Sequence, residues 1–280
     1  MKFAGRRWLV RGMLSITMIV TGVWLGLCAL LYVFQESYVY YPSRHVYTTP
    51  AALGFDYEDV ELTSTDGNRI HGWWLPAADA RGTVLFLHGN AGNIASRLST
   101  LEILYGLGLN TLIMDYQGYG NSDGRPGEQA TYDDARAAWE HLVDTRGIAG
   151  EEVIIFGRSL GGAIAAWLAS EVNAAGLIME STFTSIADMG REIYPFIPVT
   201  LLARIHYPVL EYVENINMPV LVIHSETDEL IPYTHAQRLY NAANEPRFFQ
   251  VIEGGHNEGF LQSGGIYRQG LNNFIEKVVN

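Results

Sequence analysis

Residues 156–163 of the sequence read FGRSLGGA and place Ser159 between Gly157 and Gly161. A Gly-x-Ser-x-Gly spacing is typical of a tight turn from a strand into a helix, because the missing side chains let the backbone bend and expose the serine oxygen. The apolar run EEVIIFG precedes the turn and the helical pattern LGGAIAAWLAS follows it. Ser159 is therefore predicted to be a nucleophile.

A serine hydroxyl is a weak nucleophile near neutral pH, so it needs a base within hydrogen-bond reach and a third group that orients the base. His256 lies in the glycine-flanked loop VIEGGHNEGF, which has no apolar face that would use a histidine for packing. The acidic turn HSETDELIP offers Asp228 as the orienting acid, with Glu226 as the alternative. These residue types predict a Ser–His–Asp triad that attacks a carbonyl carbon.

Acyl transfer also needs two N–H donors for the developing oxyanion, each worth about 3 kcal/mol in the transition state. The backbone N–H of Leu160, directly after the nucleophile, is the first predicted donor. The second is the backbone N–H of Asn90 in the loop LFLHGNAGN, with Ala91 as the alternative. His88 in the same loop is predicted to brace the loop rather than to act as a second base.

The elements that must position these residues follow from the apolar pattern. The stretch YEDVELTSTDGNRIHGWWLP alternates apolar and polar residues around a turn, which predicts an antiparallel hairpin over residues 57–63 and 69–75. Six continuous apolar runs then alternate with helical patterns, as parallel strands buried on both faces require: TVLFLH, NTLIMDY, EEVIIFG, AGLIME, MPVLVIHS and RFFQVIEG. We expect an α/β fold over residues 37–280, with an eight-stranded, mostly parallel sheet and helices on both faces. Ser159 then lies at the carboxyl end of a strand, where such sheets bind ligands.

The connection over residues 181–217 is long, aromatic and proline-rich, and a connection of this length is usually more than a link. We expect one or two short helices that form a small lid, with a helix packed on the edge of the sheet as the alternative. Its large apolar side chains suit either an acyl chain or ordinary packing: Phe183, Tyr194, Phe196, Leu201 and Leu202. Phe183 is predicted to border the substrate pocket, together with Tyr116 of the loop DYQGYGNSDG.

Residues 12–34, GMLSITMIVTGVWLGLCALLYVF, contain no charge and are long enough to cross a hydrocarbon core of about 30 Å as a helix. A cleaved signal peptide is the alternative, but its apolar core has about 7 to 15 residues and ends at small side chains. Here the run continues into large aromatic residues. We therefore expect residues 1–36 to form a cytoplasmic tip and a retained transmembrane anchor.

Positive charges precede this run, and Glu36 is the first charge after it. The positive-inside bias then places the N-terminus in the cytoplasm and the folded domain across the membrane, in the periplasm of a bacterium or the lumen of a eukaryotic compartment. The tyrosines that follow are expected either at the outer membrane interface or packed on the domain: Tyr38, Tyr40 and Tyr41.

The composition excludes several classes of partner. A formal charge of −12 opposes a broad phosphate-binding surface, so nucleic acid is not an expected partner. The single cysteine, Cys28, excludes an internal disulfide and a thiolate zinc cluster. The loop GNAGN lacks the spacing of a dinucleotide fingerprint, and no metal or organic cofactor is expected. The composition leaves the oligomeric state open.

The motifs HGNAGN, DYQGYGNSDG, GRSLGGA, MESTFTSIADM, HSETDELIP and GGHNE resemble, in this order, the alpha/beta-hydrolase superfamily. More narrowly, they are similar to its membrane-anchored branch related to the bud-emergence proteins, from Tyr57 to the C-terminus. The chain order Ser159, Asp228, His256 is the order of the triad in that superfamily. Ser225 departs from the pattern, since the family usually has glycine there, which loosens the geometry expected for the Asp228 loop.

The resemblance implies a serine hydrolase that cleaves carboxylic esters or thioesters through an acyl-enzyme, as lipases, lysophospholipases and acyl-thioesterases do. The expected substrate is a small acyl ester or a lipid. A serine peptidase is the alternative activity. A catalytically inactive, membrane-tethered binding module is a further alternative of a different class.

Overall fold

The structure, a computed structural model, describes residues 2–279 and is built around an eight-stranded sheet in the order β10-β9-β8-β7-β4-β6-β3-β2. The strands are β2 Glu58–Thr63, β3 Arg69–Leu75, β4 Gly82–Leu87, β6 Leu109–Met114, β7 Val153–Arg158, β8 Gly176–Glu180, β9 Val220–Ser225 and β10 Arg247–Ile252. β2 and β3 form the antiparallel hairpin, β3 runs antiparallel to β6, and the other neighbouring strands are parallel. The fold class expected from the sequence is confirmed.

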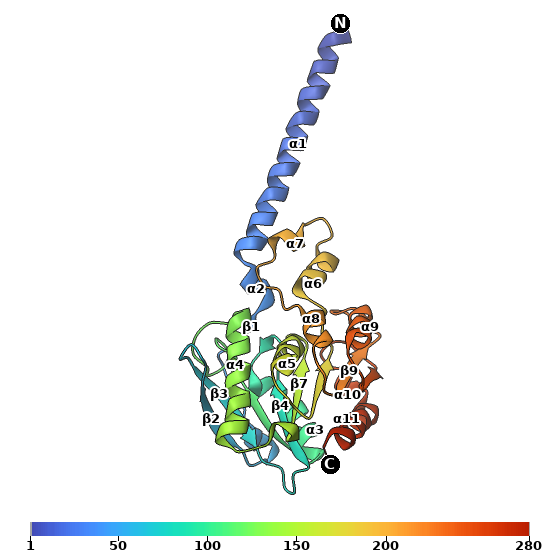
Figure 1. Ribbon diagram of the computed structural model, residues 1–280. Helices are drawn as coiled ribbons and strands as arrows, with labels where there is room; N and C mark the ends of the chain where they lie inside the picture. Colours follow the sequence, from blue (N-terminus) through green and yellow to red (C-terminus); the bar gives the residue numbers. More distant parts are fainter. Residues whose placement is uncertain (1, 280) are drawn as a thin grey trace.

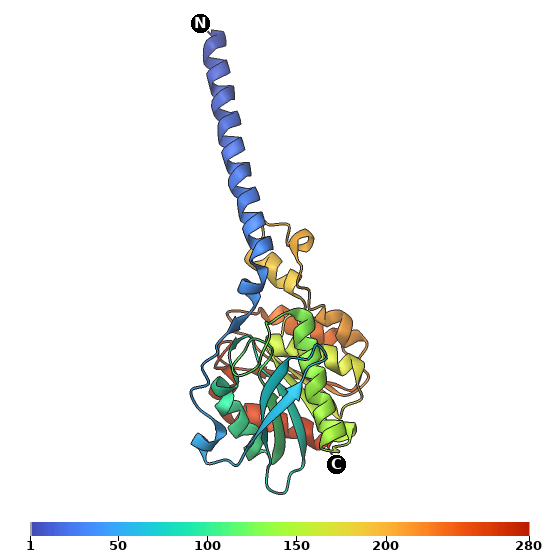
Figure 2. The same ribbon diagram turned by 90° about the vertical axis from the view of Figure 1, so that its left-hand side faces the viewer.

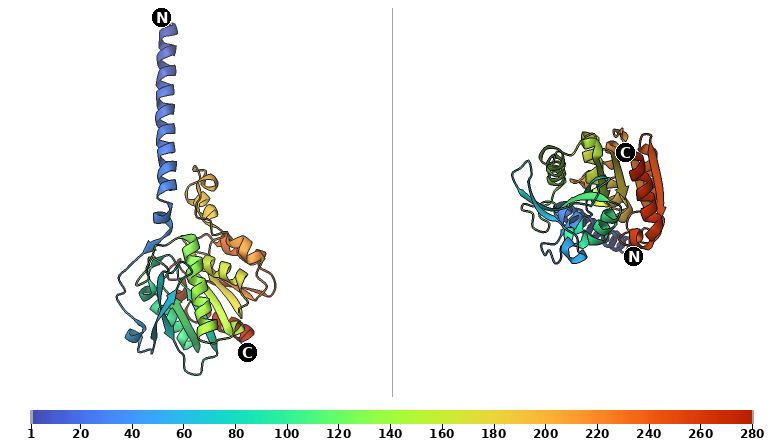
Figure 3. Two further views of the ribbon diagram at one scale, coloured as in Figure 1. Left: turned by 60° about the vertical axis from the view of Figure 1, so that its left-hand side comes forward. Right: turned by 90° about the horizontal axis from the view of Figure 1, so that it is seen from below.

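Helices cover both faces of this sheet (Figure 3). They are α3 Leu98–Gly106, α4 Glu128–Glu140, α5 Leu160–Glu171, α6 Ile186–Ile193, α7 Val199–Leu202, α8 Val209–Glu214, α9 Tyr233–Ala242, α10 Gly259–Gln262 and α11 Gly264–Val278, with short turns η1 Pro50–Leu53, η2 Ile94–Arg97, η3 His141–Thr145 and η4 Gly150–Glu152. The side chains of α4, α5, α8 and α9 enter the core on one face, and those of α3 and α11 enter the core on the other.

The strands contribute alternate side chains to these two cores. Along β4, Leu85 and Leu87 belong to one core, whereas Val84 and Phe86 belong to the other, and all four are fully buried. This follows from the two-residue period of a strand, which places successive side chains on opposite faces. A continuous apolar run is therefore the pattern of a strand covered on both faces.

The N-terminal part consists of α1 Lys2–Val33, α2 Gln35–Val39 and β1 Tyr41–Pro42, which pairs with β5 Ala91–Gly92. α1 stands away from the domain (Figures 1 and 2), and its segment Arg11–Val33 is long and apolar enough to cross a membrane. The side chains of Lys2, Arg6 and Arg7, on which the expected orientation depends, lie outside the described part of the chain.

The three tyrosines after α1 have different surroundings. Tyr40 is buried on the domain, where its hydroxyl lies 2.9 Å from the hydroxyl of Tyr207. Tyr38 and Tyr41 are exposed. Packing on the domain, one of the two expected alternatives, is therefore found for Tyr40, and the membrane interface stays a prediction for Tyr38 and Tyr41.

Residues 181–217 contain three short helices rather than the expected one or two. α6 and α7 project beside the base of α1, at the end of the domain opposite the C-terminus (Figures 1 and 2). α8 instead packs on α5 and α9, where Val209 and Val213 are fully buried. The projecting part of this connection is thus shorter than the whole segment, and its C-terminal part belongs to the core. We refer to residues 185–205 as the lid.

Candidate functional site

Ser159 occupies the tight turn between β7 and α5. Its backbone has φ 54° and ψ −120°, a conformation that residues with a side chain seldom adopt and that is concentrated at functional sites. A Cβ atom on Gly157 would lie 2.1 Å from the carbonyl oxygen of Gly161, and one on Gly161 would lie 2.0 Å from that of Leu87. Both flanking positions therefore require glycine, as the sequence spacing predicts.

Three side chains from distant parts of the chain meet at this turn. His256, after β10, has its Nε2 atom 3.1 Å from the Oγ atom of Ser159 and its Nδ1 atom 2.8 Å from Oδ2 of Asp228. The other oxygen of Asp228 accepts hydrogen bonds from the backbone N–H groups of Leu230 at 2.9 Å and Ile231 at 2.8 Å. This is the hydrogen-bond sequence that a Ser–His–Asp triad requires.

The neighbouring carboxylates have different positions. Glu226, the alternative acid, is exposed, and Asp228 is the carboxylate that contacts the imidazole. Glu229 accepts the backbone N–H of His256 at 2.9 Å and so ties the loop after β9 to the loop after β10. The sequence did not predict that Glu229 joins the two loops, because an acidic residue in a turn is usually only solvated.

The electrostatics of Asp228 favour its charged form. Burial raises the pKa of this carboxyl, but the hydrogen bonds from His256, Ile231 and Leu230 outweigh burial and hold the pKa below its ordinary value. Fully buried His224 has its Nε2 atom 3.5 Å from Oδ2 of Asp228 and 2.8 Å from the carbonyl oxygen of Ile231, which it helps to hold in place. Asp228 is thus an ionised acceptor in a fixed orientation.

Ser225, the departure from the family pattern, does not loosen this loop. Its hydroxyl donates a hydrogen bond to the carbonyl oxygen of Gly254 and accepts the backbone N–H of Thr227 at 3.1 Å. The hydroxyl of Thr227 also donates to Gly254 O, at 3.0 Å. The serine therefore connects the loop that carries Asp228 with the loop that carries His256.

The loop after β4 places Asn90 beside Ser159 and Leu160 in the wall of one cavity. Within residues 2–279, the backbone N–H of Asn90 donates to no acceptor. The backbone N–H of Leu160 lies in the first turn of α5, and the N–H groups of a first turn have no partner within the helix. The rest of Asn90 is held: its side chain donates to Val39 O at 2.7 Å and its carbonyl accepts the hydroxyl of Tyr119 at 2.7 Å.

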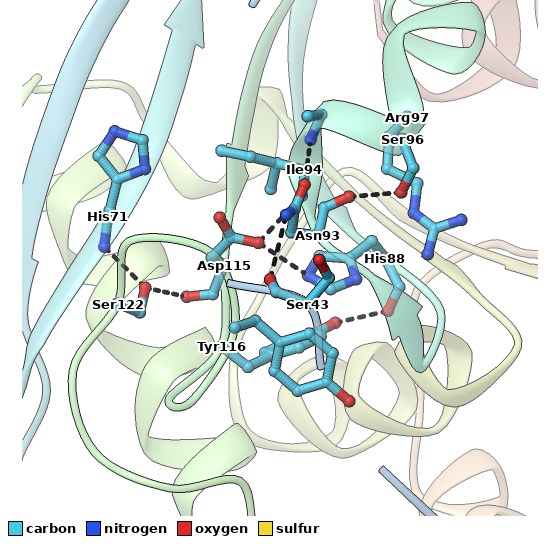
Figure 4. A network of polar contacts seen from close by, with 12 residues as sticks. Ser43, His71, His88, Asn93, Ile94, Ser96, Arg97, Asp115, Tyr116 and Ser122 are labelled. Atoms are coloured by element: carbon cyan, nitrogen blue, oxygen red, sulfur yellow. Dashed lines mark hydrogen bonds and ion pairs between the residues drawn. The ribbon is translucent and has the colours of Figure 1, made fainter. Parts of the chain in front are cut away.

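A buried polar network fixes this loop from below (Figure 4). His88 is fully buried, donates through Nδ1 to Gly89 O at 2.7 Å, and lies 3.8 Å from Asp115. Burial, aided by the charge of Arg97, lowers the pKa of His88 to about 3, so this imidazole is neutral. The guanidinium of Arg97 in turn donates to the carbonyl oxygens of Gly89 and Ala91. These contacts agree with the bracing function expected for His88.

Tyr116 belongs to the same network and not to the pocket. Its side chain is fully buried, its hydroxyl donates to His88 O at 2.9 Å, and it is absent from the cavity wall. The expectation that Tyr116 borders the substrate pocket is therefore not met. Tyr116 lies two residues after the end of β6, but its ring turns inward under the loop that carries Asn90, a direction that the sequence does not encode.

An apolar cavity of about 430 Å³ opens above Ser159. Phe183 lies in its wall, as expected, and the lid contributes Ile186, Met189, Ile193, Tyr194, Ile197, Val199 and Leu202. The opposite wall comes from the N-terminal segment, with Leu31, Gln35, Tyr38, Val39 and Tyr41. The wall contains no charged side chain among the described residues. The sequence predicted the lid side of this cavity but not the contribution of the apolar N-terminal helix.

The turn that carries Ser159 also rests on a buried ion pair that the sequence did not reveal. Arg158, directly before Ser159, has its Nε atom 2.8 Å from Oε1 of Glu180 at the end of β8. Tyr267 of α11 donates to the same carboxylate at 2.6 Å, and Thr100 of α3 contacts the guanidinium at 3.1 Å. The pair thus links the ends of β7 and β8 to the helices on one face of the sheet.

Known proteins resemble this chain over most of its length. An uncharacterized protein of Mycobacterium tuberculosis is 36% identical over 265 residues, which cover 94% of each chain. The alpha/beta hydrolase domain-containing protein WAV2 of Arabidopsis thaliana is 36% identical over 91% of this chain and 92% of its own. Protein bem46 of Schizosaccharomyces pombe is 29% identical over 94% of this chain and 90% of its own.

The family described as serine aminopeptidase S33 matches residues 78–208. Among solved structures, the Pyrococcus furiosus esterase Pf2001 covers 86% of this chain and 98% of its own with a TM-score of 0.74, at 23% sequence identity. At that identity the likeness concerns the fold. Together with the sheet order and the full-length relatives, these matches establish that the chain belongs to the alpha/beta-hydrolase superfamily.

Proposed function

We propose that this protein is a membrane-anchored serine hydrolase that cleaves carboxylic esters or thioesters through Ser159, His256 and Asp228. The observation that carries the proposal is the continuous hydrogen-bond chain from the Ser159 hydroxyl through the His256 imidazole to the Asp228 carboxylate. In this arrangement the imidazole accepts the hydroxyl proton, and the carboxylate holds the required tautomer and stabilises the imidazolium.

The reaction proceeds in two halves. Ser159 Oγ attacks the substrate carbonyl carbon while Nε2 of His256 takes the proton, and the N–H groups of Leu160 and Asn90 stabilise the oxyanion. His256 then gives the proton to the leaving alcohol or thiol, which leaves the acyl group on Ser159. A water molecule, deprotonated by the same imidazole, attacks the acyl-enzyme and releases the carboxylic acid.

Ester or thioester cleavage is favoured over peptide cleavage by the chemistry of the cavity. An aminopeptidase must bind the charged amino terminus of its substrate, and the cavity wall offers no carboxylate among the described residues. The serine aminopeptidase description of the matching family nevertheless makes peptide cleavage the second candidate. An acyl chain is the better partner for a wall of aliphatic and aromatic side chains.

Membrane anchoring is supported by the same cavity. Leu31, Gln35 and Tyr38, at and just beyond the end of the apolar segment Arg11–Val33, form part of its wall. Removal of this segment as a signal peptide would remove part of the substrate site. We therefore propose that α1 is retained as the anchor, with the domain on the side of the membrane opposite the cytoplasm.

A fluorophosphonate probe tests the proposed nucleophile, because it reacts far faster with an activated serine than with an ordinary hydroxyl group. We expect the wild-type protein to be labelled and to hydrolyse p-nitrophenyl butyrate. Ser159→Ala should lose labelling and at least about 10³-fold of its turnover with little change in stability. Ser170→Ala, near the end of the helix α5 that follows Ser159, is the matched control and should retain both labelling and turnover.

The outcomes separate the candidate functions. Folded wild-type protein that remains unlabelled would favour an inactive binding module and contradict the proposal. Faster turnover of an aminoacyl p-nitroanilide than of the ester would favour the peptidase.

A further inference from the structure

We propose that α1 forms one wall of an acyl-chain site and that the lid apex, residues 193–203, inserts into the membrane leaflet on the side of the domain. The substrate is then a long-chain acyl ester or thioester that enters the site from the bilayer. This inference rests on the serine-hydrolase function and the membrane anchoring proposed above, and it names the substrate class of that site.

One face of α1 is turned toward the lid. Trp24, Cys28 and Leu31 follow one another at intervals of four and three residues, which places them on a single side of α1, and Gln35 at the start of α2 continues this spacing. Cys28 is buried and Leu31 and Gln35 are half-buried, whereas most other side chains of this segment are exposed. The exposed sides are those that lipid must cover if α1 spans the membrane.

Specific hydrogen bonds join this face to the lid. The indole N–H of Trp24 donates to the carbonyl oxygen of Phe196 at 2.9 Å. The side chain of Gln35 donates to Leu202 O at 3.1 Å and accepts the backbone N–H groups of Arg204 at 2.6 Å and Ile205 at 2.9 Å. The lid is therefore held at two places, by Trp24 of α1 and by Gln35 at the start of α2.

These contacts place the lid apex at membrane depth. Trp24 precedes Val33, the end of the apolar segment, by nine residues, or about 14 Å of helix. Half of a hydrocarbon core is about 15 Å thick. Phe196, bonded to Trp24, thus lies within the leaflet wherever Arg11–Val33 spans the bilayer.

The composition of the apex fits lipid surroundings. Residues 193–203 contain no charged side chain, and Phe196 and Leu201 are 86% and 84% exposed. Pro195 and Pro198 have no N–H group that would remain unpaired in lipid, and Trp24 satisfies the carbonyl group of Phe196. Side chains this apolar and this exposed are unfavourable in water but favourable in a bilayer.

Arg204, the residue directly after the lid apex, marks the membrane boundary. Arg204 lies over the ring of Tyr32, 5.1 Å from its centre, at the end of the apolar segment. An arginine beside an interfacial tyrosine is typical of the head-group region. Arg204 then lies at the boundary: the lid apex is in lipid, and the domain is in water.

The cavity connects this apex with the nucleophile. α1 and α2 supply one wall, the lid supplies the other, and Ser159, Leu160 and Asn90 lie at its base. An acyl chain that lies between α1 and the lid has its carbonyl group at Ser159. The polar part of the substrate then faces the domain and its acyl chain points into the membrane, which is the orientation that a lipid has in the leaflet.

The first experiment measures chain-length preference of full-length protein in phosphatidylcholine vesicles, with p-nitrophenyl butyrate and p-nitrophenyl palmitate. Leu31→Trp enlarges a wall residue, and Leu30→Trp makes the same change next to it, at a position that is 48% exposed and outside the wall. We expect Leu31→Trp to lower the palmitate-to-butyrate ratio of kcat/KM at least about tenfold. Leu30→Trp should leave the ratio within about twofold.

Equal ratios in the two variants would overturn the proposed wall. With 1-palmitoyl lysophosphatidylcholine and an S-palmitoyl peptide in the vesicles, the same pair of variants distinguishes a lipid ester from an acylated polypeptide as the source of the chain. A lower rate of either reaction in Leu31→Trp, with no such change in Leu30→Trp, supports the acyl-chain site.

The second experiment locates the apex without using activity. A nitrobenzoxadiazole fluorophore on Leu201→Cys, in a Cys28→Ala background, should be quenched by lipids with a nitroxide on the acyl chain. The same fluorophore on Thr145→Cys, an exposed position of the domain, should not be quenched. Protection of the Leu201→Cys fluorophore from water without nitroxide quenching would assign the apex to a protein contact and overturn insertion.

The two experiments separate this inference from the proposed function. Wild-type protein that reacts with neither ester nor fluorophosphonate contradicts the hydrolase function, while nitroxide quenching still decides whether the apex enters the leaflet. Wild-type protein that is active but shows no difference between Leu31→Trp and Leu30→Trp contradicts the acyl-chain site alone.

Discussion

At the scale of single residues, Asp228 illustrates how a turn orients the carboxylate proposed for the triad. The carboxylate receives two backbone N–H groups on one oxygen and the His256 imidazole on the other. These contacts orient it and keep it charged in spite of burial. Glu226, two positions earlier, has a carboxylate of the same charge but is exposed.

We predict that Asp228→Asn lowers kcat for p-nitrophenyl butyrate by about 10³- to 10⁴-fold, because an amide no longer stabilises the imidazolium or fixes its tautomer. The matched variant Glu226→Gln removes a neighbouring charge and should retain turnover within about twofold. Steady-state kinetics of both variants beside the wild type provide the measurement. A larger loss in Glu226→Gln than in Asp228→Asn would identify the wrong acid.

The same pair of variants gives a pH dependence of stability. The pKa of Asp228 is lowered in the folded state, so the carboxylate contributes stability above its ordinary value near 3.8 and loses that contribution as the pH falls through the folded-state pKa. The difference in unfolding free energy between wild type and Asp228→Asn should therefore be larger at pH 7 than at pH 3. Urea unfolding at the two pH values measures it, and an unchanged difference would show that the contacts of Asp228 do not depend on its charge.

At the scale of elements, the turn between β7 and α5 is inseparable from the loop after β4. A Cβ atom on Gly161 would meet two backbone carbonyl oxygens, Leu87 O at 2.0 Å and His88 O at 2.6 Å. Backbone cannot move aside as a flexible side chain does. Any residue larger than glycine at this position must therefore displace the loop that carries Asn90.

We predict that Gly161→Ala destabilises the protein by about 1–3 kcal/mol or more and lowers esterase turnover at least about 100-fold, because the displaced loop carries a proposed oxyanion donor. Gly265→Ala is the matched control: a Cβ atom there has open space, and alanine favours a helix such as α11 by up to about 1 kcal/mol. Thermal unfolding and turnover of both variants test this. Wild-type behaviour of Gly161→Ala would show that the two elements are less tightly coupled than their geometry implies.

At the scale of the whole molecule, the apolar helix and the lid lie at the same end of the domain (Figure 1). This places the cavity between the folded domain and the proposed membrane. Lys2, Arg6, Arg7 and Arg11 before the apolar segment favour a cytoplasmic N-terminus. The catalytic domain and the lid then belong to the opposite side.

We predict that Thr145→Cys, an exposed position, reacts in a Cys28→Ala background with a membrane-impermeant maleimide in intact cells, because the proposed orientation places the domain outside the cytoplasm. For a bacterial host this requires only that the outer membrane be made permeable. Ala4→Cys, before the apolar segment, should react only after the cells are lysed. The reverse pattern of labelling would place the domain in the cytoplasm.

Local patterns in the sequence predicted the elements and the candidate triad residues. Continuous apolar runs predicted strands buried on both faces, and the structure confirms the α/β fold with eight strands in the sheet. The glycines around Ser159 predicted the turn, because the close approach that they permit is a local property of the backbone. Strand ends in a parallel sheet lie on one edge, so His256 and Asp228 were predicted beside Ser159 from their places after strands.

Tertiary structure alone decided what lies between these elements. Tyr116 turns beneath the Asn90 loop instead of into the cavity, and Ser225 ties two loops together. Trp24 meets the lid at Phe196, 172 positions away. Periodicity reports which face of an element is buried, but not which distant surface covers it, because that choice depends on the packing of the whole chain.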